Sequence, residues 1–403
     1  MSTPKALRPP LSLRLANAGF LLFWILIAAF PLFWIAIMSF KLPVDALASN
    51  PLTVIFGPDT RAEAGGLSVV DLLTGLAFAV LAYRLIERQI ANLARMLSVV
   101  GHASLGWLLA VLASALLLLL AFGFALPLVA GLLNTIVGLV PLLDLLAEPF
   151  IGLTVQHYIS VWADNEFYRN FINSMIVTAG VVTVSLTIGT LAGFALARTG
   201  SNLAFWLLIA ALIFRALPHS VLVSGYLPPF INSRELLMPL WDSPFLGWFF
   251  GLFSDAPPTF YGQPLAVIIV LVSINQPFTI WMLRSFFQNI PSELDEAARV
   301  DGCSHFQAFR RVIIPVMWPG VITTGLFSFL LAYNDYLVCA LLLDAQSQTM
   351  VPAITQYFNR ETTSTDTLEA IAAAVSIIAP LFVLVMIFQR QIVSGLTAGA
   401  VKG

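Results

Sequence analysis

Charged residues are scarce in this chain. Lys, Arg, Asp and Glu together make up 10% of its 403 residues, whereas a soluble globular domain carries about 25%. Hydrophobic residues make up 59%, and the mean hydropathy is +0.92. A single buried core cannot absorb so many apolar side chains. The composition therefore excludes an ordinary soluble domain and indicates a polytopic membrane protein.

Cysteines and recognisable catalytic motifs are also lacking. The two cysteines, Cys303 and Cys339, give neither a disulfide framework nor a metal-binding pattern. No G-x-x-x-x-G-K-[ST] stretch is present to cradle ATP phosphates, and neither H-E-x-x-H nor G-x-S-x-G occurs. The sequence therefore predicts no catalytic residue, no metal site and no enzymatic activity of its own.

Long apolar runs dominate instead, and a membrane-spanning helix needs about 20 apolar residues. The first run, Phe20–Phe40, is too long for the apolar part of a signal peptide, so we expect a retained helix. Seven further spans are predicted at Leu67–Tyr83, Leu105–Leu126, Ser174–Ala197, Leu203–Leu222, Pro264–Met282, Val316–Leu342 and Ala370–Phe388. Pro127–Leu146 is apolar too, but its prolines favour a re-entrant or interfacial segment.

The basic residues predict the orientation, because cytoplasmic segments of membrane proteins are enriched in Lys and Arg. If the N-terminus is cytoplasmic, most of the nineteen basic residues fall on that side: Lys5, Arg8, Arg14, Arg84, Arg88, Arg95, Arg198, Arg284, Arg299, Arg310, Arg311, Arg390 and Lys402. Most acidic residues fall elsewhere. We therefore expect both termini in the cytoplasm, and larger outer segments at Lys41–Gly66, Gly225–Gln263 and Leu343–Glu369.

One charged segment, "ELDEAARVDGCSHFQAFRRVIIPVMWPG" (residues 293–320), interrupts the apolar pattern on the predicted cytoplasmic side. Acidic residues directly after Ser292 favour a helix start, because the helix dipole attracts anions there. Gly302 offers the left-handed conformation that ends a helix, and Ser304 with Gln307 has the spacing of a capping box. The pattern predicts two short helices joined at Gly302, with Pro315 marking the change into the next span.

One alternative is that this segment is an interfacial amphipathic helix that lies on the membrane surface. Helices of that kind are usually basic on their polar face. This segment is acidic first and basic last, with a glycine break between the two parts. A protein partner therefore fits it better.

The spacing within this segment resembles a known motif. Glu296-Ala297-Ala298, then Gly302 after three residues, then Val312-Ile313-Ile314-Pro315 after nine more, is similar to the EAA loop of ABC importer permeases. In that family the loop is the coupling helix, which docks in a cleft of the cytoplasmic ATPase. Ile314 stands where the family usually has Leu. Four further stretches resemble the MalG-like second permease of carbohydrate importers: "PFTIWMLRSFFQNIPSELDEAA" (277–298), "QRQIVSGLTAGAVKG" (389–403), "FPLFWIAIMSFK" (30–41) and "YISVWADNEFYRNFINSMIVT" (158–178).

The resemblance implies an all-α polytopic membrane protein with the MalG-like six-helix permease core. It covers residues 15–56 and about 151–403 but not 62–150, so about two inserted N-terminal helices are expected in addition, giving about eight spans. The expected division is residues 1–61 for the N-terminal tail and first transmembrane helix, 62–150 for the inserted hydrophobic region, and 151–403 for the permease core, with the coupling loop at 291–315.

The implied function is that of the transmembrane permease subunit of a bacterial ABC importer, a multi-pass protein of the cytoplasmic (inner) membrane that moves a sugar or related polyol inward. Expected partners are a second homologous permease, two ATPase subunits, an extracytoplasmic solute-binding protein, the sugar and the lipid bilayer, with no nucleic acid. The chain itself is expected to hold no cofactor, since ATP and Mg would bind the ATPase. The alternative is an ion- or proton-coupled secondary transporter, for which Asp335 is the one plausible relay residue.

Three groups of candidate site residues follow. The resemblance assigns ATPase coupling to Glu296, Ala297, Ala298, Gly302 and Pro315. Polar residues inside predicted spans are candidates for the substrate pathway, because neutral polyols need amides, hydroxyls and aromatic faces: Asn275, Gln276, Tyr333, Asn334 and Asp335. The alternative is that these side chains bond between helices or cap helix breaks. Gly189 and Gly193 form a small-residue face that favours helix packing.

The third group lies before the last predicted span. In resembling maltose-type systems the loop at this position enters the binding protein and helps to dislodge the sugar. Here "QYFNRETTSTD" (356–366) offers Tyr357, Phe358, Asn359 and Arg360, whose rings and polar groups suit contacts with a sugar. The alternative is a passive connector whose aromatic rings rest at the membrane interface.

Overall fold

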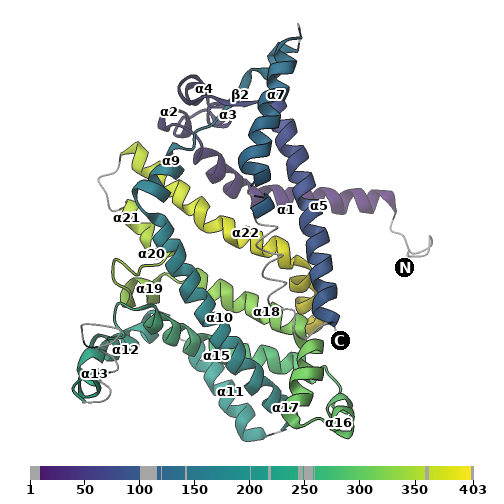
Figure 1. Cartoon of the computed structure of the whole chain (residues 1–403), viewed down its shortest axis with the longest axis vertical. Coiled ribbons are helices and arrows are strands. Elements are labelled where there is room, and N and C mark those ends of the chain that lie inside the picture. The colour runs from purple at the N-terminus through teal and green to yellow at the C-terminus, as the bar shows by residue number, and fades with distance from the viewer. Residues whose placement is uncertain are drawn as a thin grey trace. The chain divides into compact units, whose positions relative to one another are not determined.

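The computed structural model describes residues 10–99, 116–118, 120–140, 143–199, 201–216, 219–243, 248, 257, 259–358 and 363–400. Nearly all of these lie in helices, which Figure 1 shows in chain order. Contacts divide the chain into two compact units. The first comprises Met1–Arg84, Ala113–Asp164 and Arg360–Ser376, and the second comprises Leu85–Leu112, Asn165–Asn359 and Ile377–Gly403.

Six helices among the described residues are long and apolar enough to cross a membrane: Ser12–Met38, Leu116–Gly138, Phe167–Arg198, Pro264–Gln288, His305–Tyr333 and Ser364–Gln389. The predicted all-α polytopic membrane fold is therefore confirmed. The predicted span Leu67–Tyr83 lies on α5 (Val69–Val99). The predicted span Leu203–Leu222 falls on α11 (Asn202–Arg215) and the start of α12 (His219–Ile231). With 14 residues α11 is about 21 Å long and too short for a crossing by itself, and the total of eight spans stays a prediction.

Two predicted interruptions at prolines are absent. Pro127 lies inside the apolar helix that runs through π-helical turn η2 (Ala121–Ala125) into α7 (Leu126–Gly138). Pro315 lies inside the helix that runs from α17 (His305–Ala308) through π-helical turn η4 (Phe309–Ile313) into α18 (Ile314–Tyr333). A proline clashes with the carbonyl one turn earlier, and a π-helical turn placed there changes the position of that carbonyl. The first part of Pro127–Leu146 therefore continues a membrane helix instead of forming a separate re-entrant segment.

The first unit begins with α1 (Leu11–Met38), followed by α2 (Pro43–Ala46), α3 (Pro51–Phe56) and α4 (Pro58–Ala64). Strand β1 (Gly66–Ser68) then pairs antiparallel with β2 (Pro149–Gly152), with Gly66 opposite Gly152. A Cβ atom on Gly66 would lie 2.1 Å from the carbonyl oxygen of Ile151, so only glycine fits there. This ribbon brings the two ends of the predicted insertion together.

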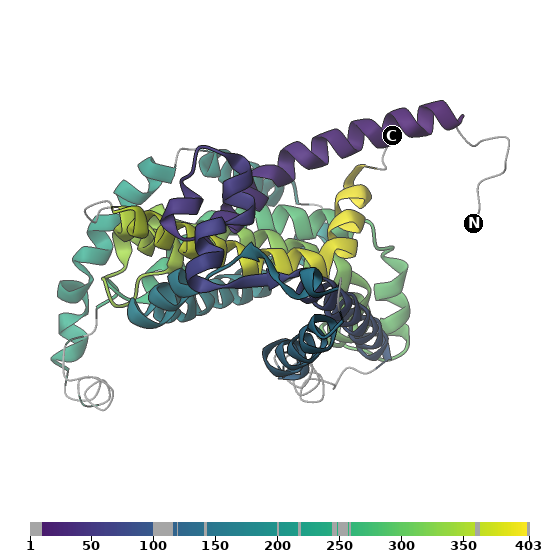
Figure 2. The same ribbon diagram turned by 90° about the horizontal axis from the view of Figure 1, so that it is seen from above.

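Helices α5 and α7 of the insertion lie side by side in both views (Figures 1 and 2). Asn134 of α7 donates from Nδ2 to Oδ1 of Asp71 on α5 at 2.8 Å. The Ser68 hydroxyl donates to Oδ1 of Asn134 at 2.8 Å. The start of the inserted helix pair is thus fixed by a small polar network beside the ribbon.

A second polar network lies directly after α1. Lys41 is fully buried, and its ammonium group donates to the carbonyl oxygen of Gly152. Asp45, also fully buried, accepts from the backbone N–H of Thr60 at 2.6 Å and from its hydroxyl at 2.7 Å. Burial lowers the pKa of Lys41, and the nearby Asp45 carboxylate opposes that shift only in part.

In the second unit, α10 (Phe167–Arg198), α15 (Pro264–Gln288) and α18 pack against one another. The predicted small-residue face of α10 is a packing face. A Cβ atom on Gly193 would lie 3.0 Å from the backbone nitrogen of Arg284 and 3.1 Å from Cβ of Leu283. The absence of a side chain at Gly193 therefore lets the backbones of α10 and α15 approach closely.

The other elements are short connecting helices and turns, together with the long helix α22, which carries the last candidate span. They are α8 (Asp144–Ala147), α9 (Gln156–Ile159), π-helical turn η3 (Ser160–Asp164), α13 (Ser233–Trp241), α16 (Glu293–Val300), α19 (Leu337–Leu342), α20 (Met350–Ala353), α21 (Thr355–Phe358) and α22 (Ser364–Ala400).

Candidate functional site

The charged segment folds largely as predicted. Helix α16 ends at Val300, and Gly302 follows two residues later with a φ of +86°, in the left-handed region. The backbone N–H of Cys303 donates to the Ala298 carbonyl and that of Gly302 to the Arg299 carbonyl, each at 3.0 Å. These two bonds form a Schellman motif, which satisfies carbonyls at a helix end. Our prediction of a left-handed glycine at this turn is confirmed.

The second helix also starts as predicted, at the capping box of Ser304 and Gln307. The Gln307 N–H donates to the Ser304 hydroxyl at 3.3 Å, and the Ser304 N–H donates to the Gln307 side-chain oxygen at 2.9 Å. This helix is not short, because it continues to Tyr333. Pro315 therefore lies within the membrane helix and not at its start. The Gly302 turn, α17 and η4 separate it from α16.

Two of the five predicted coupling residues lie on the open side of α16. Glu296 and Ala297 are exposed, whereas Ala298 is buried. Two large apolar side chains of the segment are also exposed, Val300 at 87% and Phe306 at 64%. Exposed apolar groups beside a carboxylate are typical of a surface that binds another protein.

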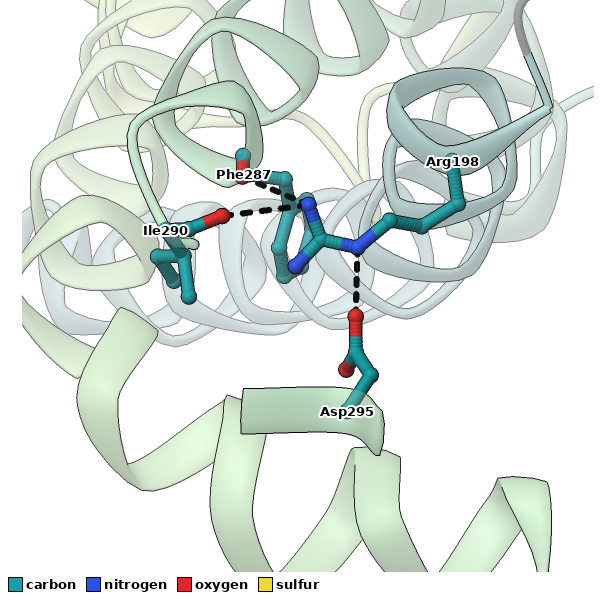
Figure 3. A network of polar contacts seen from close by, with 4 residues as sticks. All are labelled: Arg198, Phe287, Ile290 and Asp295. Carbon is teal, nitrogen blue, oxygen red and sulfur yellow. Dashed lines mark hydrogen bonds and ion pairs between the residues drawn. The ribbon is translucent and has the colours of Figure 1, made fainter. Parts of the chain in front are cut away.

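The inner side of α16 is attached to the bundle by Arg198, the last residue of α10 (Figure 3). Its Nε donates to Oδ2 of Asp295 at 2.6 Å. Its Nη1 donates to the carbonyl oxygens of Ile290 at 3.1 Å and Phe287 at 3.4 Å. The side chains of Arg198 and Asp295 are 21% and 19% exposed. One guanidinium group thus joins the end of α10, the end of α15 and the first turn of α16.

This contact changes the role predicted for Asp295. Asp295 lies in the acidic first turn of α16, where the sequence pattern predicted a helix start, and Ser292 makes no side-chain capping bond there. Asp295 instead directs its carboxylate to Arg198. Arg198 itself was missed as a site residue, because in the sequence it counted only as a charge at the cytoplasmic end of a span.

An aromatic cluster supports the same region. The ring of Phe194 on α10 lies 5.5 Å from that of Phe287 on α15 and 4.9 Å from that of Phe309 in η4. Ile313 and Met317 are buried in the same cluster. The three elements that lead to α16 therefore share one packed core, and α16 rests on a stiff base.

Two predicted pathway residues lie together at the interface of α10, α15 and α18. Asn275 is 1% exposed and donates from Nδ2 to the Ser328 hydroxyl of α18 at 2.8 Å. Gln276 donates from Nε2 to the Ser185 carbonyl of α10 at 3.4 Å. The side-chain oxygens of both amides are buried without a hydrogen-bond partner among the described residues, and so is the Ser185 hydroxyl. The amide nitrogens bond between helices, whereas the oxygens keep unused acceptor capacity.

The other three predicted pathway residues do not join that pair. Tyr333 is buried, and its hydroxyl donates to the Ile377 carbonyl at 2.9 Å. Asn334 donates to the Leu330 carbonyl at 3.0 Å and so caps the end of α18. Asp335 accepts from the N–H groups of Val338 at 2.9 Å and Cys339 at 3.2 Å, which caps the start of α19. The span predicted at Val316–Leu342 is present, but its predicted end is wrong, because capping at this pair of residues ends the membrane helix at Tyr333.

The predicted binding-protein loop is only partly described. Tyr357 is 4% exposed, and its ring meets that of Phe167 edge-on at 6.4 Å. It is therefore not available to stack on a sugar, contrary to our prediction, because it packs on α10. Phe358 ends α21; its side chain, together with Asn359 and Arg360, lies outside the described residues.

The first unit contains a cavity of about 560 Å³ that sequence reasoning did not find. It is lined by Leu42, Pro43, Thr154, Val155, Gln156, His157, Ile159, Ser160, Asp164, Thr365 and Glu369. The Ser160 hydroxyl donates to Oε1 of Glu369 at 2.6 Å. No single local pattern marks this cavity in the sequence, since it is formed by three separate segments.

Comparison with known proteins places these features in a family. A bacterial ABC transporter for the import of the acidic polysaccharide alginate, solved by crystallography, has a chain that aligns with 60% of this one and is itself covered to 81%, at 19% identity and a TM-score of 0.45. The trehalose/maltose transport system permease protein MalG of Thermococcus litoralis is 29% identical over 252 residues, 62% of this chain and 82% of that protein. The diacetylchitobiose uptake system permease protein DasC of Streptomyces coelicolor is 34% identical over 253 residues, again 62% and 82%.

The family match covers more than half of the chain and includes both regions described above. Residues 185–397 match the binding-protein-dependent transport system inner membrane component. The matched range contains the Asn275–Gln276 pair, the whole of α16 and the capping box. This chain is therefore a member of the family of binding-protein-dependent transport system inner membrane components, as the spacing around Glu296 and Gly302 indicated.

Proposed function

We propose that this chain is one of two permease subunits of a bacterial ABC importer, and that it moves a sugar or a related polyol inward. A second, homologous permease would complete the pathway, and two ATPase subunits would bind ATP and Mg²⁺. An extracytoplasmic binding protein would deliver the substrate. In this arrangement both termini and α16 face the cytoplasm, on the same side as the ATPase.

The observation that carries this proposal is the position of α16. It is a short helix between two membrane helices, α15 and His305–Tyr333, with Glu296 and Val300 exposed on it and Phe306 exposed at the start of the next helix. Its inner side is held by Arg198 and by the aromatic cluster. A helix fixed to the bundle on one side and open on the other is suited to transmit movement from a docked partner to the membrane helices.

The substrate class rests on the relatives and on the polar interface. DasC is named for diacetylchitobiose and MalG for trehalose and maltose. In this chain the unused amide oxygens of Asn275 and Gln276 are acceptors that suit sugar hydroxyls, once the helices separate during alternating access. Asp335 uses its carboxylate to cap α19, which argues against a proton-relay role and so against a secondary transporter.

Reconstitution tests this proposal. The chain would be placed in proteoliposomes with its partner permease and ATPase, and the binding protein with radiolabelled disaccharides would be added outside. We expect uptake that requires ATP, ATPase and binding protein together. Uptake driven by a proton or sodium gradient without the ATPase would overturn the assignment.

A further inference from the structure

The contact between Arg198 and Asp295 is incomplete in a specific way. An arginine can hold a carboxylate with two parallel bonds, one from Nε and one from the Nη atom on the same edge of the guanidinium group. That atom is Nη2. Here the Nε bond to Oδ2 is made at 2.6 Å, but Nη2 of Arg198 and Oδ1 of Asp295 are both buried without a partner in the part of the chain that the structure describes. Figure 3 shows this nitrogen on the side of Asp295 without a dashed line.

The two unpartnered atoms are the donor and the acceptor of the missing second bond. Forming that bond requires Asp295, which lies in the first turn of α16, to reorient relative to the end of α10. Nη1 is already held by the carbonyls of Ile290 and Phe287 at the end of α15. The guanidinium group is therefore fixed to α15, and Asp295 is the partner that can move against it.

We propose that Arg198 is a positioning residue of the transport cycle, and that its contact with Asp295 alternates between the one-bond state of this structure and a two-bond state reached when α16 reorients. Closing the second bond draws α16 and α10 together. Helix α10 also carries Ser185, whose carbonyl holds Gln276, so one helix connects the Arg198 contact with the polar interface. This inference rests on the proposed function, since it assumes that α16 is moved by the ATPase.

A static role is the competing explanation, because arginine side chains commonly bond to the last carbonyls of a helix. In that case Arg198 would only stabilise the fold. The two explanations differ in what a substitution changes. A static contact affects melting temperature and assembly, whereas a transmitting contact affects how many sugar molecules are taken up for each ATP hydrolysed.

The experiment uses the complete reconstituted transporter with the variants Arg198→Lys, Arg198→Gln and Asp295→Asn. Lysine keeps the charge but cannot make the two-bond contact. We expect Arg198→Lys to retain ATPase co-purification and a near wild-type melting temperature while the ratio of uptake to ATP hydrolysis falls. For Arg198→Gln and Asp295→Asn we expect that ratio to fall by roughly 5- to 150-fold, the range of typical coupling between two sites.

Arg169→Gln is the matched control. Arg169 lies on the same helix and pairs with Glu166 at 3.0 Å, but the two side chains are 61% and 49% exposed. Such a surface pair contributes little, so the ratio should stay at the wild-type value. A wild-type ratio in Arg198→Lys would overturn the two-bond state, and a wild-type ratio in Arg198→Gln would overturn the positioning role altogether. If the unsubstituted transporter shows no ATP-dependent uptake, the proposed function fails instead.

Discussion

The turn at Gly302 allows a graded test of the coupling segment. Its φ of +86° is a conformation that costs an L-residue about 1–2 kcal/mol. An added Cβ atom would meet nothing within 4 Å, so the backbone conformation alone sets the penalty. Two Schellman bonds of 3.0 Å depend on this conformation. Replacing Gly302 should therefore lower the population of the native turn, relative to other conformations of this segment, by about 5- to 30-fold.

The order of the effects follows from side-chain chemistry. Asn tolerates the left-handed region better than other residues, Ala pays the ordinary cost, and a β-branched residue pays most. We expect sugar uptake to fall in the order Gly302→Asn, Gly302→Ala, Gly302→Val. The recovery of ATPase on affinity purification should fall in the same order, because the turn orients α16 for docking. Uptake would be normalised to the amount of protein in the membrane.

A matched control separates docking from general loss of stability. Gly65 also has a positive φ, +84°, with nothing within 4 Å of an added Cβ atom, but it lies at the end of α4. Gly65→Ala should lower the melting temperature without reducing ATPase recovery beyond the loss of protein. The reasoning would be refuted by wild-type uptake in Gly302→Val, or by equal losses of ATPase recovery in Gly65→Ala and Gly302→Ala.

Two further predictions concern packing and pH. Gly193→Val should lower the free energy of unfolding by about 1–3 kcal/mol, because its Cβ would press on the backbone of α15. Gly75→Ala should not lower it, because there is open space around Gly75. Thermal unfolding of both variants in detergent makes the comparison. Lys41→Met should cost about 1–3 kcal/mol, since it leaves the buried carbonyl of Gly152 without its donor. Because the pKa of Lys41 is lowered in the folded protein, the wild type should gain stability relative to Lys41→Met as pH rises from that lowered pKa toward 10.5, which melting curves over this range would check.

Local signals in the sequence predicted local structure well. The capping box at Ser304 and the left-handed turn at Gly302 depend on residues within five positions of each other, so both can be identified from spacing alone. The packing face at Gly189 and Gly193 was also visible, because small residues at this spacing have few other uses in a membrane helix. The apolar runs predicted most of the membrane helices, because a run of about 20 apolar residues has few other uses.

Choices between competing partners could not be predicted. Asp295 had the sequence position of a helix-start residue, and its selection of Arg198 depends on a helix almost 100 residues earlier. The side chains of Asn334 and Asp335 are suited both to a substrate pathway and to helix capping. In the structure they bond to nearby backbone groups and cap helix ends. The prolines at 127 and 315 looked like interruptions because a π-helical turn has no clear sequence signature.

The unpaired polar atoms on and around α10 point to a helix that is built to move. Among the described residues, buried atoms without partners include the Ser185 hydroxyl, the side-chain oxygen of Gln276 opposite α10, and Nη2 of Arg198 at the end of α10. Each such unpaired group lowers the stability of the folded protein by about 1–3 kcal/mol. In a contact that never changed, this free energy could be recovered by a permanent hydrogen-bond partner. These costs are lowered in any arrangement that supplies the missing partners, whether from Asp295 or from a substrate. In the proposed cycle, an equilibrium between two arrangements of α16 against α10 and α15 then responds both to the ATPase and to substrate, which is the condition for coupling ATP hydrolysis to transport.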